Sequence, residues 1–185
     1  EIATLHQSAL ATYKFMGVSD KVKVTFMGNQ VRMVATSQTG VLLSDTTLPL
    51  PTNGLIFIQG KFEVQGNVSG RVTIASMGAG TVTGPLVYTD QDGDKPYVLK
   101  NSAGTVIPDV QSTGTAKWLE PNFTYTPNTG YNPNPNNMPA LGIMLQNDLT
   151  VGPMAPYNME VMAAVFSSLG NWHMDLTTVK GNLRG

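Results

Sequence analysis

Three carboxylates within five residues form the clearest candidate for a chemical site in this sequence, at Asp90-Gln91-Asp92-Gly93-Asp94. A calcium loop needs closely spaced oxygen ligands and a glycine for its turn. The spacing departs from an EF-hand, because the twelfth position from Asp90 is Asn101 rather than glutamate. One hypothesis is therefore a calcium site made by Asp90, Asp92 and Asp94, and the other is a solvated turn. Calcium is the only cofactor that the sequence suggests.

A second candidate site is a set of basic residues that are expected to point outward from neighbouring strands. Such a stripe would follow the phosphate backbone of a nucleic acid. The acids Asp20 and Glu63 lie beside the lysines in sequence, so ordinary surface charge is the alternative interpretation. The candidate DNA-binding or partner-binding residues are Lys21, Lys23, Lys61 and Arg71.

Residue patterns that indicate catalysis are missing from the sequence. The two histidines, His6 and His173, stand at opposite ends of the chain, and there is no cysteine. No G-x-S-x-G elbow, P-loop or dinucleotide-binding fingerprint occurs. Outside residues 90–94 the acids are scattered, so no pair of carboxylates for glycoside cleavage can be named. These absences favour a protein that is not an enzyme.

Composition indicates an exported protein rich in β-structure. Only 12% of the 185 residues are charged, about half the usual share. Glycine (19) and proline (12) are abundant, and the net charge of −1 gives no strong overall attraction to nucleic acid. No run approaches the ~20 apolar residues of a membrane span. The chain opens on Glu1, and we expect a mature or excised fragment of an exported bacterial protein, located extracellularly or at the cell surface.

The elements that must position these residues are short strands with period-two alternation. In residues 54–88, apolar and polar residues alternate and glycines recur at short intervals. Inward and outward side chains alternate along a strand, and glycine is favoured where no Cβ fits. This pattern predicts an all-β fold with a β-solenoid (β-helix-like) core. The expected corners are Gly60, Gly66, Gly70, Gly78, Gly80 and Gly84.

The predicted solenoid core accounts for two of four expected sections, all within one structural domain. Residues 1–50 form an N-terminal section, with a short helix over 1–13 and a β-hairpin of strands 22–26 and 31–36. Solenoid rungs follow over 51–88 and return over 141–185. Between them, 89–140 is a long inserted excursion that contains most of the prolines and a small hairpin of 97–99 with 105–110.

Three stretches resemble a family of bacterial envelope and pilus-associated proteins. They are PTNGLIFIQGKFEVQGNVSGRVTIAS (51–76), TGPLVYTDQDGD (83–94) and a final stretch, 141–185, that contains LGIMLQNDLTV and APYNMEVMAAVFSS. The family includes a DNA-uptake (competence) type IV pilin that carries a β-solenoid. The resemblance implies a solenoid fold and a place on a pilus-like assembly, with pilus or envelope subunits as partners.

These observations lead to a functional hypothesis with open alternatives. We expect a non-enzymatic, cell-surface or pilus-associated binding module, with roles in DNA uptake or adhesion. Its ligand would be DNA, a surface polysaccharide or another subunit. The alternatives are a carbohydrate-active or phage-spike-like protein and a purely structural envelope repeat whose exposed last rung stacks on a neighbouring subunit.

Overall fold

Strands account for all the regular secondary structure that is described in this protein. The computed structural model describes residues 13–15, 21–106, 124–152, 155 and 160–174. Within these ranges there are 14 strands and no helix, so the all-β class is confirmed. The helix expected over 1–13 falls almost entirely on residues outside the described ranges. No described helix has the length and apolarity needed to cross a membrane.

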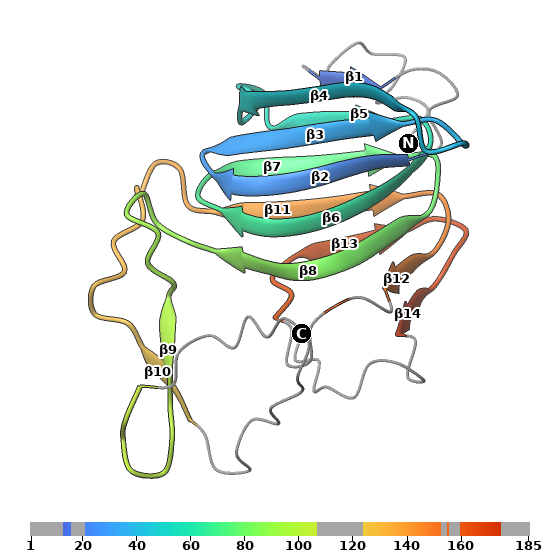
Figure 1. Cartoon of the computed structure of the whole chain (residues 1–185). Helices are drawn as coiled ribbons and strands as arrows, with labels where there is room; N and C mark the ends of the chain where they lie inside the picture. The colour runs from blue at the N-terminus through green and yellow to red at the C-terminus, as the bar shows by residue number, and fades with distance from the viewer. Residues whose placement is uncertain (1–12, 16–20, 107–123, 153–154, 156–159, 175–185) are drawn as a thin grey trace.

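A mixed seven-stranded sheet forms the front layer in Figure 1. Five of its strands are parallel neighbours in the order β14-β12-β8-β6-β2, and β2-β3-β4 continue the sheet as an antiparallel meander. Its strands are β2 (Lys21–Gly28), β3 (Gln30–Thr36), β4 (Leu42–Pro49), β6 (Lys61–Val68), β8 (Gly80–Tyr88), β12 (Leu149–Val151) and β14 (Trp172–Met174).

The second layer is a five-stranded sheet in which all neighbours are parallel, in the order β1-β5-β7-β11-β13. Figure 1 shows it behind the seven-stranded sheet. The chain passes from one sheet to the other between successive strands, for example from β5 to β6 and from β7 to β8. Its strands are β1 (Tyr13–Phe15), β5 (Leu55–Ile58), β7 (Arg71–Ser76), β11 (Ala140–Leu145) and β13 (Ala164–Ser167).

The main core is a layer of apolar side chains between the two sheets, and Leu55, Phe57 and Ala75 form a smaller, separate buried cluster. In β2 the inward residues Val22, Val24 and Phe26 are almost fully buried, whereas the residues between them are at least partly exposed. Inward residues of neighbouring strands stand opposite one another, as Ile56 does with Ile74 in the five-stranded sheet. Both sheets contribute to the same buried cluster, so neither sheet is covered on its inner face without the other.

The antiparallel meander closes one end of this core. The inward residues of β3, Val31, Met33 and Ala35, are buried in the same cluster as those of β2. The Tyr13 hydroxyl on β1 donates a hydrogen bond to the carbonyl oxygen of Pro49 on β4, at 2.9 Å. The meander therefore links the seven-stranded sheet to the first strand of the five-stranded sheet.

Side-chain hydrogen bonds connect the corners where the chain leaves the five-stranded sheet. The Ser76 hydroxyl donates to the carbonyl oxygen of Gly60 at 2.9 Å, and the Ser167 hydroxyl donates to that of Asn147 at 2.7 Å. The Asn147 amide in turn donates to the carbonyl oxygen of Met77 at 3.1 Å. Carbonyl groups at each corner thus find partners in the neighbouring corner.

The excursion after β8 contains an antiparallel pair, β9 (Tyr97–Lys100) with β10 (Thr124–Pro127), which forms a separate two-stranded sheet. Tyr97 donates its hydroxyl proton to the Glu160 carboxylate. The Lys95 ammonium lies 3.4 Å from the same carboxylate. Tyr97 and Lys95 therefore join the excursion to Glu160, whose neighbour Val161 bridges Leu86 on β8.

The prediction of a β-solenoid core is wrong. The structure is two sheets packed face to face, of which the larger is mixed, with antiparallel pairing in β2-β3-β4. Alternation along a strand records only that one side is buried, so it does not distinguish a solenoid from two packed sheets. The expected hairpin of 22–26 with 31–36 is confirmed.

Two finer expectations can be compared with the structure. Gly66, Gly80 and Gly84 lie inside strands rather than at corners. A Cβ on Gly80 would collide with the Phe62 ring, so this glycine leaves room for a core side chain. Strand β9 pairs with β10, and Lys100 bridges Val106, whereas residues 107–110 of the expected hairpin of 97–99 with 105–110 lie outside the described residues.

We predict that Gly66→Ala destabilises the protein strongly. Gly66 has a φ of 114°, and a Cβ there would lie closer than 3.0 Å to the backbone of Phe26 on the neighbouring strand. Positive φ costs about 1–2 kcal/mol for an L-residue, and forced overpacking adds about 1–3 kcal/mol. The decrease in the free energy of unfolding of Gly66→Ala, measured by urea denaturation, should be about the sum of these two costs.

Gly104→Ala is the matched control for this prediction. Gly104 also has a positive φ, 78°, but nothing lies within 4 Å of its Cβ position. The Gly104→Ala variant should therefore lose only the stability that a positive φ costs, without the cost of overpacking. Equal losses in the two variants would show that the contact with Phe26 is unimportant.

Candidate functional site

The ends of four strands gather at one edge of the seven-stranded sheet. Strands β2, β4, β6 and β8 run in the same direction, because β4 is antiparallel to β3 and β3 is antiparallel to β2. Their carboxyl ends therefore meet on one side, to which the arrowheads of these four strands point in Figure 1. A hollow of about 690 Å³ opens there. We call it the polar hollow.

Side chains with neutral polar groups line much of the polar hollow. Asn29 follows β2, Asn67 stands near the end of β6, and Asn137 approaches from the excursion. All three are exposed. Each amide has two donor hydrogens and an acceptor oxygen, so the hollow presents both kinds of hydrogen-bonding group. The lining residues include no lysine or arginine.

Apolar groups stand beside these amides. Met27 at the end of β2 is 43% exposed, and Pro49 and Leu50 at the end of β4 also line the hollow. A small-molecule site commonly combines apolar surface with a few convergent polar groups. The polar hollow has this combination.

The acidic turn forms one wall of the polar hollow, and Asp90 organises it. Asp90 is 3% exposed. One carboxylate oxygen accepts the backbone N–H groups of Asp92 at 3.0 Å and Asp94 at 2.8 Å. The other oxygen accepts the N–H of Asn132 at 2.9 Å. The carboxylate thus closes its own turn and holds the excursion against it.

These hydrogen bonds lower the pKa of Asp90. The largest cause is the bond from the Asn132 N–H, and the N–H groups of the turn act in the same direction, whereas burial opposes them. Hydrogen bonds to a carboxylate favour its charged form. Burial, together with the negative charge of Asp90, raises the pKa of the nearby Tyr131. Asp90 is therefore negatively charged at neutral pH, and its hydrogen bonds stabilise the fold.

The geometry does not favour the calcium hypothesis for Asp90, Asp92 and Asp94. Among the residues that the structure describes, no group of three or more His, Cys, Asp or Glu side chains is placed to hold a metal ion. The oxygens of Asp90 face backbone N–H groups, whereas Asp92 and Asp94 are exposed. Calcium binding stays a prediction, and the described contacts are those of a turn.

The four candidate basic residues do not form one stripe. Lys21, Lys23 and Lys61 lie on the outer side of the seven-stranded sheet, on β2 and β6. Arg71 begins β7 in the other sheet, and its Nε donates to the carbonyl oxygen of Met138 at 3.2 Å. The sequence could not separate these positions, because it does not tell which strands share a sheet.

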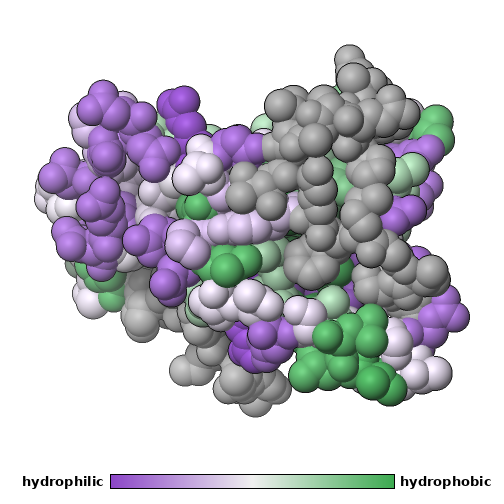
Figure 2. All heavy atoms as spheres, turned by 90° about the horizontal axis from the view of Figure 1, so that it is seen from above, coloured by the Kyte–Doolittle hydropathy of each residue, from purple (hydrophilic) through white to green (hydrophobic). Residues whose placement is uncertain are grey.

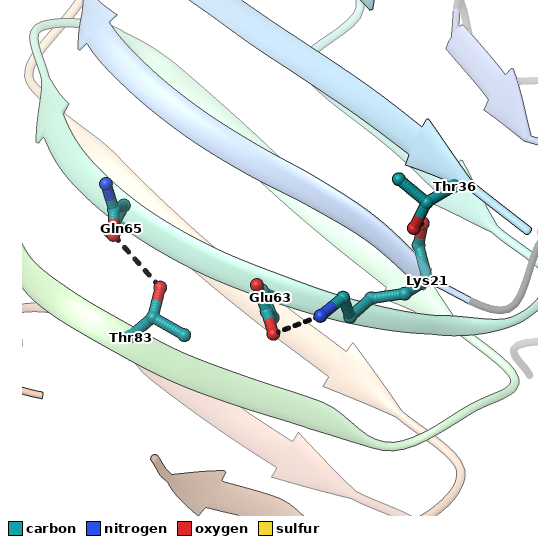
Figure 3. A network of polar contacts seen from close by, with 5 residues as sticks. All are labelled: Lys21, Thr36, Glu63, Gln65 and Thr83. Carbon is teal, nitrogen blue, oxygen red and sulfur yellow. Dashed lines mark hydrogen bonds and ion pairs between the residues drawn. The ribbon is translucent and has the colours of Figure 1, made fainter. Parts of the chain in front are cut away.

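An acid also interrupts the lysines on that outer face. The Lys21 ammonium lies 2.8 Å from the Glu63 carboxylate, and Figure 3 shows this ion pair running between the two strands. Farther along the same face, the Thr83 hydroxyl lies 3.0 Å from the side-chain oxygen of Gln65 (Figure 3). The face is a mixture of charged and neutral groups, with Lys23 and Lys61 beside the pair.

Motif analysis identified Asp90 and Asp92 in the polar hollow but missed its three asparagines as binding residues. Asn29, Asn67 and Asn137 belong to no catalytic or metal-binding pattern. A weak signal does exist, because Asn29 and Asn67 each stand where an alternating run gives way to a glycine-containing or serine-containing turn. Recognising that these turns meet requires knowing that their strands are parallel neighbours.

Comparison with known proteins gives no functional assignment, since no family model, curated protein or solved structure matches the chain. The resemblance to envelope and pilus-associated proteins therefore stays a prediction.

We predict that Asp90→Asn weakens the fold at neutral pH and flattens its response to acid. Because the folded-state pKa is lowered, the carboxylate stabilises the fold above its unfolded pKa, and this contribution is lost as the pH falls below about 4. Urea midpoints from neutral to acidic pH measure the effect.

Asp92→Asn serves as the control, because this aspartate stands in the same turn but is exposed. Its urea midpoint should change little at any pH. If both variants lost the same stability at neutral pH, the hydrogen bonds of Asp90 would not be the cause.

Proposed function

We propose that this protein is a non-enzymatic binding module of the bacterial cell surface, and that its polar hollow binds a neutral, hydroxyl-rich ligand such as a surface polysaccharide. The observation that carries the proposal is the lining of the hollow, in which exposed amides stand beside apolar groups and no basic residue takes part. Hydroxyl groups both donate and accept hydrogen bonds, which complements the amides.

The electrostatics of the hollow support a neutral ligand over a nucleic acid. Binding to a phosphate backbone depends on lysine and arginine contacts. The hollow instead contains the Asp90 anion and the exposed Asp92. A ligand that carries many phosphates would meet negative charge there.

The contacts and the lowered pKa of Asp90 do not suit it as the general acid of a glycosidase. The general acid of a glycosidase is a carboxyl group whose pKa is raised, so that it carries a proton at working pH. The pKa of Asp90 is lowered, and its oxygens accept backbone N–H groups. This carboxylate is suited to holding the wall of a binding site.

The proposed cell-surface location rests on composition and on the resemblance of 51–76, 83–94 and 141–185 to envelope proteins. Few charges and many neutral polar residues are typical of exported β-proteins. Display on a pilus-like or other surface assembly would bring the hollow to a polysaccharide at the cell exterior. Adhesion is the role that fits this placement.

We predict that Asn67→Ala weakens polysaccharide binding about two- to twelvefold, because one lost hydrogen bond costs about 0.5–1.5 kcal/mol. Isothermal titration with dextran, mannan and galactan would identify a ligand and then measure the change. Asn136→Ala is the control, because this asparagine is exposed next to Asn137 but does not line the hollow.

Double-stranded DNA in a salt series is the competing ligand. Tight DNA binding that falls steeply with salt, and that is lost when Lys21, Lys23 and Lys61 are changed to alanine but kept in Asn67→Ala, would replace the proposal with a DNA-binding face on β2 and β6. The absence of binding to every polysaccharide tested, together with this DNA result, would overturn it.

A further inference from the structure

The seven-stranded sheet has two edge strands, β14 and β4, and each carries or adjoins exposed apolar side chains. Leu169 and Trp172, at the β14 edge, are 75% and 45% exposed. At the start of β4, Leu42 and Leu43 are 58% and 57% exposed, and Val41 precedes them at 59%. Figure 2, which looks onto the molecule from above, shows a compact hydrophobic patch at its lower right.

Trp172 occupies a core position that lacks a covering strand in the described part of the chain. Its register row runs from Trp172 to Leu149 on β12 and on to Gly80 on β8. Leu149 is fully buried, whereas Trp172 on β14, the last described strand of this sheet, is 45% exposed. A strand placed beyond β14 would bury the indole.

The two edges match in strand direction. β14 is parallel to β12, β8, β6 and β2. β4 has the same direction, because it follows two antiparallel pairings from β2. A second copy shifted along the sheet, without rotation, would therefore set its β4 parallel to β14 of the first copy and continue the sheet.

The two edges also match in register. The row that contains Trp172, Leu149 and Gly80 continues through Phe62, Val22 and Ala35 to Ser44 on β4. In the shifted arrangement, Trp172 of one copy falls on the row of Ser44 of the next. The apolar segment 41–43 then lies against 169–172, which contains the exposed Leu169 and Trp172.

Charge does not oppose this contact. Residues 161–174 contain no Asp, Glu, Lys or Arg, whereas edge strands that resist pairing commonly carry charges. The one charged residue of β4, Asp45, is held by Arg32 through hydrogen bonds of 2.8 and 2.6 Å. Two neutral edges meet without like-charge repulsion.

We propose that the protein associates head to tail with copies of itself, with the β14 edge of one copy pairing with the β4 edge of the next. Such a contact is heterologous, so it leaves a free edge at each end and extends into longer assemblies. This proposal is independent of the polysaccharide site, because the polar hollow lies at the ends of β2, β4, β6 and β8.

Sedimentation velocity over a concentration series tests the proposal with two variants, Leu169→Asp and Leu42→Asp. Both positions are highly exposed, so folding should be unaffected, and circular dichroism checks this. We expect the wild type to form assemblies that grow with concentration. Each variant alone should remain a single chain, and an equal mixture of the two should form a dimer through the one intact pair of edges.

Val106→Asp is the control, because Val106 is 53% exposed but lies on neither edge. It should assemble like the wild type. A wild type that remains a single chain at every concentration would overturn the proposal. So would association that is lost in Leu169→Asp but kept in Leu42→Asp alone, since that result indicates two-fold pairing of β14 edges.

Discussion

The rest of the structure depends on the single apolar layer that the two sheets share. Each sheet has an inner face that is buried only by the other, and inward residues of both belong to one cluster. Burial of apolar surface is the main favourable term in folding, so the sheets gain stability only together. The layer also restricts side-chain volume, as Gly80 shows by leaving room for the ring of Phe62.

The shared layer also determines where function can be placed. Parallel strands β2, β6 and β8 have their inward rows aligned with one another, so their carboxyl ends coincide at one edge. Polar turns that are far apart in the sequence therefore meet there and form the polar hollow. Asp90 then stabilises this edge, because its carboxylate accepts hydrogen bonds from both the turn and the excursion.

The two ends of the apolar layer differ in how they are covered by the described strands. At one end the meander β3-β4 contributes buried residues and connects to β1 through Tyr13. At the other end, the described strands stop at β13 and β14 with Trp172 half exposed on an inward row. The difference gives the molecule a polarity along the sheet, which is what a directional assembly requires.

Much of the local structure was predictable from the sequence, because alternation depends on neighbouring residues alone. The strand runs of β2, β3, β5, β6 and β7 follow from alternating or continuous apolar residues, and the β2-β3 hairpin follows from a short turn. The acidic turn was recognisable too, from three aspartates in five residues. The structural role of the turn was not predictable, since one donor to the Asp90 carboxylate is the backbone N–H of Asn132, 42 residues away.

The sequence by itself determined the all-β class, the faces of the main strands and the scarcity of charge, because period-two patterns and composition are local properties. Only the tertiary structure decided that the strands form two packed sheets rather than a solenoid, that Arg71 lies on a different sheet from Lys21, and that Asn29, Asn67 and Asn137 share one hollow. The physical reason is that pairing between distant strands depends on how the whole apolar layer packs, and no single segment contains that information.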